Sequence, residues 1–323
     1  MISRSTYFLL FIFLSLALIA CESESTQVEY HASNFEIIEP IRDILEHEDS
    51  VLLVGGDDKG FIATSGLDMA KIALGSKRFG QPIYSAAYFN NHWYLGMANA
   101  SFQRGTTLNS ISPLYIERQN WIGTEYQHQV RKMVSTDSQM FAIVGGKLAF
   151  GVVYSMDTIQ PDWNPYSIEN ELRALSVLEE DGSVHVWVGG NGVMLKKELG
   201  SEWRRLNVKE GFISAIHFFN LNDGLAVTYD GEILMSSDGG ESWDTKMKAN
   251  GKKGVNGLKF FSNIGVIAAN SGHFAISTDN GNTWGWYELS QADLDIYDAY
   301  LSHGKLWLGT SAGLGYVMLN DLI

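Results

Sequence analysis

Hydrophobic residues lie along this chain in short runs that are too short for helices and that recur at nearly constant spacing. Each run combines aliphatic, β-branched or aromatic residues and ends in small residues, as in VLLVGG from Val51 and VWVGG from Val186. Turn sequences such as Asn191-Gly192 separate them, which is typical of β-strands. The runs begin at Val51, Trp93, Phe141, Val186, Leu225, Val266 and Leu306. The pattern therefore predicts an all-β protein of seven similar units.

A second repeat consists of two segments with the pattern S-x-D-x-G-x-[S/T]-W, known as the Asp-box. Their defining residues are Ser236, Asp238, Gly240 and Trp243 in the first segment, and Ser277, Asp279, Gly281 and Trp284 in the second. We expect the Asp and hydroxyl side chains to hydrogen-bond the backbone of a tight hairpin in which Gly takes a positive φ. We expect the tryptophans to bury their rings between neighbouring sheets as part of the core. Degenerate copies place Trp121, Trp163 and Trp203 at similar spacing.

The hydrophobic runs and the Asp-box segments predict the same architecture. Residues 29–323 number 295, so seven units average about 42 residues, which matches four-stranded propeller blades. The last unit supplies only three strands, near Ile296, Leu306 and Gly315. We expect the stretch from Val28 to Ile38 to complete that blade, with Tyr30 in place of the repeated tryptophan. The sequence thus predicts a seven-bladed β-propeller with Asp-box repeats, closed by its N-terminal strand.

The N-terminus predicts export. Residues 1–20 contain Arg4 followed by an apolar run from Tyr7 to Ala20, which is typical of a signal peptide and too short for a transmembrane helix. The run ends in LIAC, and its Cys21 is the single cysteine of the chain. This resembles the lipobox of bacterial lipoproteins, which implies lipidation of Cys21, a polar tether over residues 21–28 and location at the outer membrane, in either leaflet.

The net charge of the chain disfavours some classes of binding partner. Removal of residues 1–20 takes away one basic and no acidic residue, so the mature chain carries 22 minus 37, or −15. Nucleic acid and anionic lipid surfaces attract basic proteins, so we expect no nucleic-acid partner and membrane contact through the lipid anchor alone. We expect a monomer. The scattered histidines and the lone cysteine predict no metal site, and no cofactor is expected.

The stretch from Ile213 to Trp243 resembles the propellers related to photosystem II assembly and stability factors, and the likeness extends over residues 170–290. This resemblance implies a propeller that binds other proteins in the cell envelope, in assembly or quality control, without catalysis.

A candidate binding site emerges from the first strand of each unit. In a propeller these strands begin near the axis, so equivalent positions form a ring around one mouth of the central channel. Alignment of the strand starts gives Arg42, Tyr84, Arg131, Arg173, Ser214, Asn256 and Tyr297. Because guanidinium groups bind carboxylates and phosphates in a bidentate manner, the ring predicts a site for an anionic ligand or a protein carrying one.

Two alternatives stay open. Each arginine could instead pair with a neighbouring acid, for instance Asp43 or Glu171, in a purely structural surface lipoprotein. A sialidase-like glycoside hydrolase would hold a substrate carboxylate with the arginines, and Tyr84 or Tyr297 could then serve as its nucleophile. The order Pro40, Ile41, Arg42 departs from the sialidase motif, in which proline follows arginine, and no catalytic acid can be assigned. The sequence therefore favours a non-catalytic protein.

Overall fold

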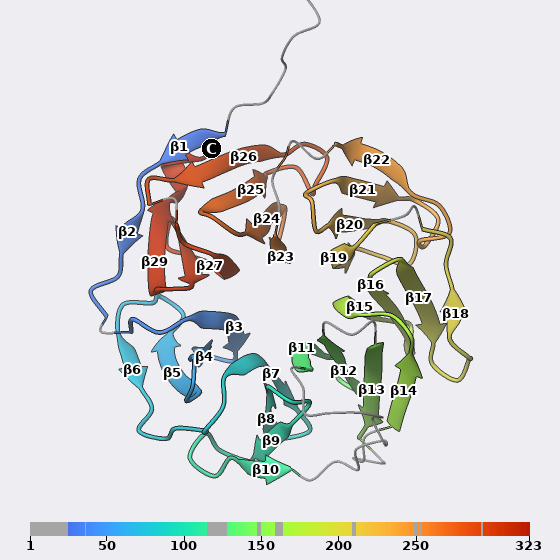
Figure 1. Ribbon diagram of the computed structural model, residues 1–323, viewed down its shortest axis with the longest axis horizontal. Helices are drawn as coiled ribbons and strands as arrows, with labels where there is room; N and C mark the ends of the chain where they lie inside the picture. The colour runs from blue at the N-terminus through green and yellow to red at the C-terminus, as the bar shows by residue number, and fades with distance from the viewer. Residues whose placement is uncertain are drawn as a thin grey trace, which may run out of the picture.

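Seven β-sheets stand around a central axis in a computed structural model of the chain, as Figure 1 shows. The structure describes residues 25–323 except 36, 115–127, 147–149, 159–163, 209–210, 249–250, 252–253 and 292. Each sheet is one blade of a β-propeller, so the predicted fold class and blade number are confirmed. The signal peptide, Cys21, Trp121 and Trp163 lie outside the described residues. Within the described ranges, no helix has the length and apolar character needed to span a membrane.

The strands follow one order in every blade, from the axis outward. The innermost strands are β3 (Ile41–His47), β7 (Ile83–Phe89), β11 (Gln129–Ser135), β15 (Leu172–Glu180), β19 (Ile213–Phe218), β23 (Val255–Phe261) and β27 (Ile296–Ser302). The second strands are β4 (Ser50–Gly55), β8 (His92–Met97), β12 (Gln139–Gly146), β16 (Ser183–Gly190), β20 (Gly224–Thr228), β24 (Ile264–Ala269) and β28 (Lys305–Thr310).

The third strands are β5 (Phe61–Gly66), β9 (Phe102–Gly105), β13 (Phe150–Asp157), β17 (Val193–Glu198), β21 (Ile233–Ser236), β25 (His273–Ser277) and β29 (Gly313–Met318). The outer strands of the first six blades are β6 (Ile72–Leu74), β10 (Ser112–Leu114), β14 (Asn164–Ile168), β18 (Arg204–Arg205), β22 (Asp244–Met247) and β26 (Gly285–Leu289). A short 3-10 helix, η1 (Leu319–Asp321), follows β29.

The seven hydrophobic runs of the sequence are the second strands. Each blade packs both faces against its neighbours, so these strands are apolar at successive positions instead of alternating. Trp187 of β16, for example, has no exposed surface and stacks on Phe218 of the next blade with 3.8 Å between ring centroids. The core is therefore a series of clusters between blades, arranged around the axis.

The small residues that end the second strands have a steric role. A Cβ atom on Gly55 would lie 1.9 Å from the carbonyl oxygen of Pro40, and one on Gly190 would lie 1.8 Å from that of Glu171. In both blades, therefore, the backbone that leads into the innermost strand passes directly against the end of the second strand. Only glycine allows this approach, and it fixes where the innermost strand begins.

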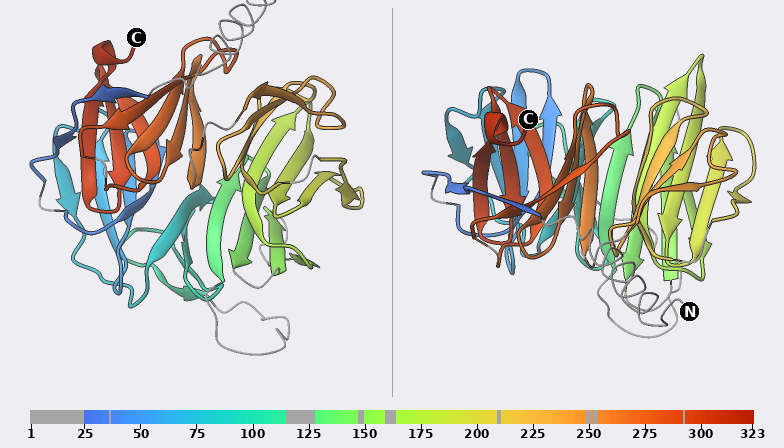
Figure 2. Two further views of the ribbon diagram at one scale, coloured as in Figure 1. Left: turned by 45° about the horizontal axis from the view of Figure 1, so that its top comes forward. Right: turned by 90° about the horizontal axis from the view of Figure 1, so that it is seen from above.

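The N-terminal segment closes the ring, as the missing strand in the last blade predicts. Strand β2 (His31–Ala32) pairs antiparallel with β29 and forms the outer strand of the seventh blade. Gly315 of β29 leaves room for the ring of Tyr30, because a Cβ there would lie 2.1 Å from the tyrosine Cζ. In addition, β1 (Thr26–Val28) pairs in parallel with β26 of the sixth blade, which the sequence did not predict. Figures 1 and 2 show both blue strands beside the red C-terminal strands.

The two S-x-D-x-G-x-[S/T]-W segments form the turns between β21 and β22 and between β25 and β26. In the first turn Asp238 accepts hydrogen bonds from the Ser242 amide and hydroxyl, and Ser236 Oγ accepts one from the Gly240 amide. The second turn repeats this set around Asp279. Gly240 has a φ of 91°, a conformation that favours glycine. Side-chain hydrogen bonds thus replace strand pairing in these turns.

The repeated tryptophans differ from the expectation that they lie fully in the core. Trp203, Trp243 and Trp284 are only half-buried, and each packs against the edge of a core cluster. The Trp243 indole packs edge-on against Phe218 and donates a hydrogen bond to the Gly240 carbonyl. Fully buried tryptophan occurs instead on the second strands, where neighbouring blades cover both faces.

Removal of the closing segment should destabilise the whole propeller. Val28 is buried, which contributes about 1.5–3 kcal/mol, and the hydrogen bonds of β1 and β2 add about 1 kcal/mol each. We expect a chain that starts at residue 34 to unfold with a free energy at least about 3 kcal/mol lower than a chain that starts at residue 22. Urea unfolding followed by tryptophan fluorescence measures the difference. Equal midpoints for the two chains would show that closure does not depend on this segment.

Candidate functional site

One backbone irregularity recurs in all seven blades at the mouth of the channel. The innermost strand of each blade loses its register with the second strand at one residue near its start. The displaced residues are Arg42, Tyr84, Arg131, Arg173, Ser214, Asn256 and Tyr297. A β-bulge leaves its extra residue unpaired and turns that side chain away from the ladder. The seven aligned positions are therefore the seven bulges.

Six of these side chains line one pocket of about 220 Å³ at the axis, together with Gln129. The exception is Ser214, which is fully buried beside the mouth. Gln129 precedes Arg131 by two residues on β11 and was missed by the alignment of strand starts. No local pattern singled it out, because the bulge at Arg131 breaks the regular alternation of side chains along β11.

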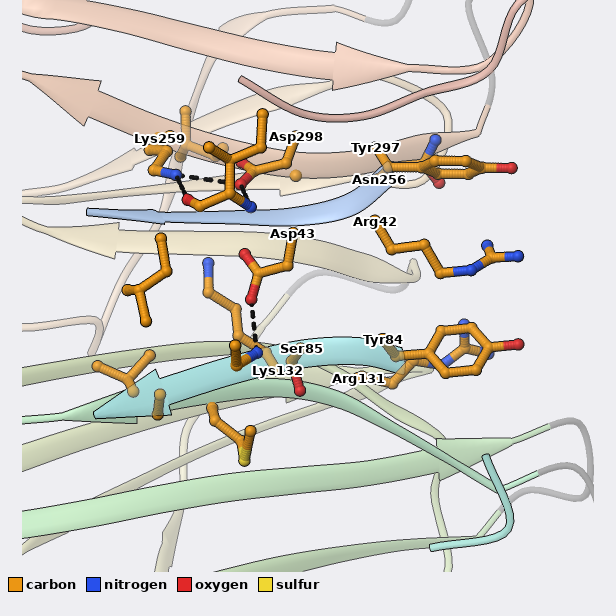
Figure 3. A pocket seen from close by; sticks show the side chains of 18 of the residues that line it. Arg42, Asp43, Tyr84, Ser85, Arg131, Lys132, Asn256, Lys259, Tyr297 and Asp298 are labelled. Carbon is orange, nitrogen blue, oxygen red and sulfur yellow. Dashed lines mark hydrogen bonds and ion pairs between the residues drawn. The ribbon is translucent and has the colours of Figure 1, made fainter. Parts of the chain in front are cut away.

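Arg42 lies between two tyrosines, as Figure 3 shows. Its guanidinium carbon is 4.8 Å from the ring centroid of Tyr84 and 5.1 Å from that of Tyr297. The two rings thus hold the guanidinium group of Arg42 by cation–π contacts on the channel axis. The nearest carboxylate is Asp57, which is exposed and lies 3.6 Å from one terminal nitrogen. Asp43 is not the partner of Arg42, since its carboxylate points into the channel and accepts a hydrogen bond from the Ala86 amide at 2.8 Å.

The other two arginines are held by different contacts. Arg131 pairs with Glu171 at 3.6 Å, and both side chains are largely buried. Arg173 donates a hydrogen bond of 3.0 Å to the Asn256 side-chain oxygen, and its guanidinium lies over the ring of Tyr229. Charge-assisted hydrogen bonds are usually about 2.7–2.9 Å long, so the carboxylates of Glu171 and Asp57 stand near the arginines without saturating them.

The mouth keeps a positive charge. Burial, followed by the nearby charge of Arg173, lowers the pKa of Arg131 to about 10 against the opposing effect of Glu171. Burial also lowers the pKa of Arg173. A pKa of about 10 leaves Arg131 protonated at neutral pH. Three arginines thus face two carboxylates, in a chain whose formal net charge is −14.

Several polar atoms at the mouth have no hydrogen-bond partner in the part of the chain that the structure describes. They are Nε of Arg42, Nε of Arg131, Oε1 of Gln129 and Oγ of Ser214, and all four are buried. Folded proteins rarely leave such atoms unpaired, because each costs about 1–3 kcal/mol. Gln129 does donate a hydrogen bond to the Tyr84 hydroxyl through its amide nitrogen, which fixes the tyrosine ring. The arrangement can accept a group that offers oxygen acceptors to the arginines.

Beneath the mouth lies a second layer of charged side chains that the sequence reasoning did not identify. Lys259 forms an ion pair of 3.0 Å with Asp298, whose carboxylate also accepts a hydrogen bond from the Ile44 amide. Asp43 and Lys132 line the same cavity of about 270 Å³ (Figure 3). Burial, and then the carboxylate of Asp298, raise the pKa of Asp43 to about 7. Burial lowers the pKa of Lys132. The channel therefore changes from arginines at its mouth to a balanced set of acids and lysines below.

Comparisons with known proteins support the fold. No protein-family model matches the chain, and no curated protein does. The solved structures that resemble it include YCF48 bound to D1 peptide, with 15% identity, a TM-score of 0.64 and coverage of 91% of this chain and 96% of that one. YCF48 from Cyanidioschyzon merolae has 12% identity, a TM-score of 0.62 and coverage of 91% and 100%.

The WD40 β-propeller domain of Doa1 is similar at 11% identity, with a TM-score of 0.64 and coverage of 90% of this chain and 96% of that domain. At such low identities the likeness establishes a β-propeller and nothing finer. The resemblance of residues 170–290 to photosystem II assembly factors is therefore supported at the level of the fold.

The raised pKa of Asp43 predicts how stability depends on pH. An ordinary Asp titrates near about 3.9, so folded Asp43, with a pKa of about 7, binds its proton more tightly than the unfolded chain does. Proton binding by Asp43 therefore contributes fully to the free energy of unfolding below about pH 4, and this contribution is lost as pH rises through about 7. We expect Asp43→Asn, which stays neutral, to gain stability relative to the parent over this range, by a few kcal/mol at about 1.4 kcal/mol per pKa unit.

Urea unfolding of both proteins at several pH values between about 4 and 8 measures this difference. Asp230→Asn, in an exposed turn, is the matched control and should show no such trend. If the parent and Asp43→Asn give parallel curves, the carboxyl of Asp43 does not bind a proton across this range.

Proposed function

We propose that this protein is a non-catalytic, lipid-anchored propeller of the cell envelope, which binds a protein partner through a carboxylate or other anionic group at the arginine mouth. One observation carries the proposal: the unpartnered, buried Nε atoms of Arg42 and Arg131 lie around a pocket that also holds Arg173. A bound carboxylate would supply the acceptors that these guanidinium groups lack, in the planar geometry that they favour.

The size and shape of the mouth support a protein partner. A pocket of about 220 Å³ is small for a free ligand but large enough for one acidic side chain or the end of a chain. Tyr84 and Tyr297 at its rim offer apolar surface and hydroxyl groups to whatever carries the anion. The solved structure of YCF48 bound to D1 peptide shows that a propeller of this shape binds a peptide, which adds support.

The charge distribution favours approach of an acidic partner at the arginine mouth. The chain has 37 acidic and 23 basic residues, so an acidic partner is repelled over much of the surface. The mouth is the place where three arginines outnumber their neighbouring carboxylates. An acidic segment would therefore be oriented toward the axis before contact, which favours recognition over non-specific adhesion.

The alternatives have less support. A purely structural ring would have its arginine donors paired internally, whereas two Nε atoms are unpaired. A sialidase-like hydrolase would activate a tyrosine with a carboxylate base. In the described part of the chain, Tyr84 instead accepts a hydrogen bond from Gln129, and Tyr297 lies against Arg42. Residues at the mouth thus favour binding over hydrolysis.

The proposal of lipid anchoring rests on the sequence alone, on the apolar run of residues 7–20 and the position of Cys21. It agrees with the fold, because the chain enters the propeller at β1, on the outer edge of the sixth blade.

Loss of the arginines should abolish partner binding without unfolding the protein. We expect the variant Arg42→Gln, Arg131→Gln, Arg173→Gln to bind its partner at least about tenfold more weakly per arginine lost, since hydrogen bonds to charged groups contribute about 1.5–3 kcal/mol each. Partners are captured from detergent-solubilised envelopes by the mature parent, identified by mass spectrometry and then titrated as purified proteins or peptides.

The matched control is the variant Arg104→Gln, Arg204→Gln, Arg205→Gln, which removes the same charge at positions outside the mouth. Selective loss in the mouth variant supports the proposal. Equal binding by the parent and both variants contradicts it and assigns the mouth a structural role.

The lipid anchor has its own test. We expect the full-length protein to incorporate an alkyne-labelled fatty acid and to fractionate with membranes, while Cys21→Ala does neither because it lacks the acylated thiol. Ser23→Ala in the adjoining tether is the control and should behave as the parent. Export of an unlabelled parent into the soluble fraction would contradict lipidation and leave the mouth proposal intact.

A further inference from the structure

A second pocket lies at the seam where the ring closes, on the face opposite the arginine mouth. Its volume is about 530 Å³, within the usual range for small-molecule sites. Residues 31–35, here called the strap, form one wall through Ser33 and Phe35, and the seventh blade forms another through Lys305, Trp307 and Tyr316. Because β27 begins at the mouth and ends at Ser302, the neighbouring Lys305 belongs to the opposite face.

The central charged group of this pocket is Lys305. Its ammonium nitrogen is 4.2 Å from the ring centroid of Tyr316 and 5.4 Å from that of Trp307. Its contacts in the described part of the chain are with these rings, and no carboxylate there forms an ion pair with it. The side chain is half-buried, so it has lost part of its hydration without gaining a counter-ion.

Two further donors in the pocket wall are unpaired. The indole N–H of Trp307 and the hydroxyl of Ser33 are buried without hydrogen-bond partners among the described residues. Asp68 is the carboxylate among the described residues that line the pocket, and it accepts a hydrogen bond from the Ala70 amide. Lys305, Trp307 and Ser33 thus present three donors, and the walls include the rings of Phe35, Trp307 and Tyr316.

We propose that the seam pocket binds a small organic carboxylate with an apolar or aromatic body. The carboxylate pairs with the Lys305 ammonium and accepts from the nearby donors, and the apolar body packs against Phe35 and Met69. Hydrated inorganic anions fit this site less well because aromatic walls cannot replace their water.

The position of the pocket gives the ligand a structural effect. The strap is attached to the seventh blade by β2 and by the hydrogen bond from the Ser33 amide to the Leu314 carbonyl. A ligand held between the strap and Lys305 binds only while the strap is in place, so it stabilises the closed ring. Ligand binding in the seam pocket is thus coupled to docking of the strap, and so to closure of the propeller.

The test uses benzoate as the probe and the indole N–H resonance of Trp307 as the reporter, assigned with Trp307→Phe. We expect benzoate, titrated to about 10 mM, to shift this resonance with saturation, as for a fragment with a Kd near about 1 mM. Benzamide, which keeps the ring and the carbonyl but has no charge, should shift it at least about tenfold less at equal concentration, since a hydrogen bond to a charged group is worth about 1.5–3 kcal/mol.

Lys305→Met keeps the aliphatic stem and removes the ammonium, and we expect it to weaken benzoate binding at least about tenfold. Lys197→Met is the matched control, because Lys197 also lies over an aromatic ring, that of Trp203, outside both pockets. At a benzoate concentration of ten times its Kd, hydrogen exchange of the strap amides should slow about tenfold.

An unmoved Trp307 resonance, or equal responses to benzoate and benzamide, overturns the proposal. Equal benzoate affinity in Lys305→Met and Lys197→Met overturns it as well. A shift of Trp307 without slower exchange in the strap overturns the coupling to ring closure. In the Arg42→Gln, Arg131→Gln, Arg173→Gln variant, benzoate should shift the Trp307 resonance as it does in the parent. This result would show that the seam pocket binds benzoate independently of the arginine mouth.

Discussion

The pairing of β2 with β29 is the contact on which the rest of this structure depends. Each blade is apolar on both faces and is stable only between two neighbours, so a row of blades must close into a ring. Here the chain closes it with only two residues of strand, reinforced by Val28 in β1 and by the ring of Tyr30 over Gly315. The first and last segments of the sequence therefore fold as one blade, and their contact fixes the axis.

Once the ring is closed, the geometry of the mouth follows from local sterics. Glycines at the ends of second strands, such as Gly55 and Gly190, let the incoming backbone pass within contact distance. The innermost strand then starts with a bulge, and the bulged residue turns toward the axis. The bulge recurs in every blade, and six of the seven bulged residues line the pocket at the same end of the channel. Function depends on which residues occupy those positions.

The charges in the channel are arranged by depth. At the mouth, tyrosine rings and an amide hold Arg42 and Arg173, while Asp57 and Glu171 offset only part of the charge of the three arginines. One layer below, Lys259 and Asp298 neutralise each other, and burial raises the pKa of Asp43. A ligand that enters through the mouth therefore contacts the arginines before it reaches the layer of paired acids and lysines below them. This order favours binding at the rim over passage through the channel.

The architecture could be predicted from local patterns in the chain. The runs from Val51 to Leu306 predicted the second strands, because strands covered on both faces must be apolar throughout, and the three-strand last unit predicted closure by the N-terminal segment. The sequence also aligned the residues from Arg42 to Tyr297, since equal spacing in a cyclic fold places them at equal depth. The turn chemistry of Asp238 and Asp279 followed from residue type alone.

Which side chains contact one another depends on how the blades pack. Asp43, adjacent to Arg42 in sequence, points away from it because the bulge turns the two side chains apart, and Asp57 takes its place. Ser214 is equivalent to the arginines by position but is buried, and Gln129 enters the site from outside the alignment. The half-burial of Trp243 and the seam pocket around Lys305 depend on how separate blades pack. Contacts between blades join residues far apart in the chain, and no local pattern of residues specifies them.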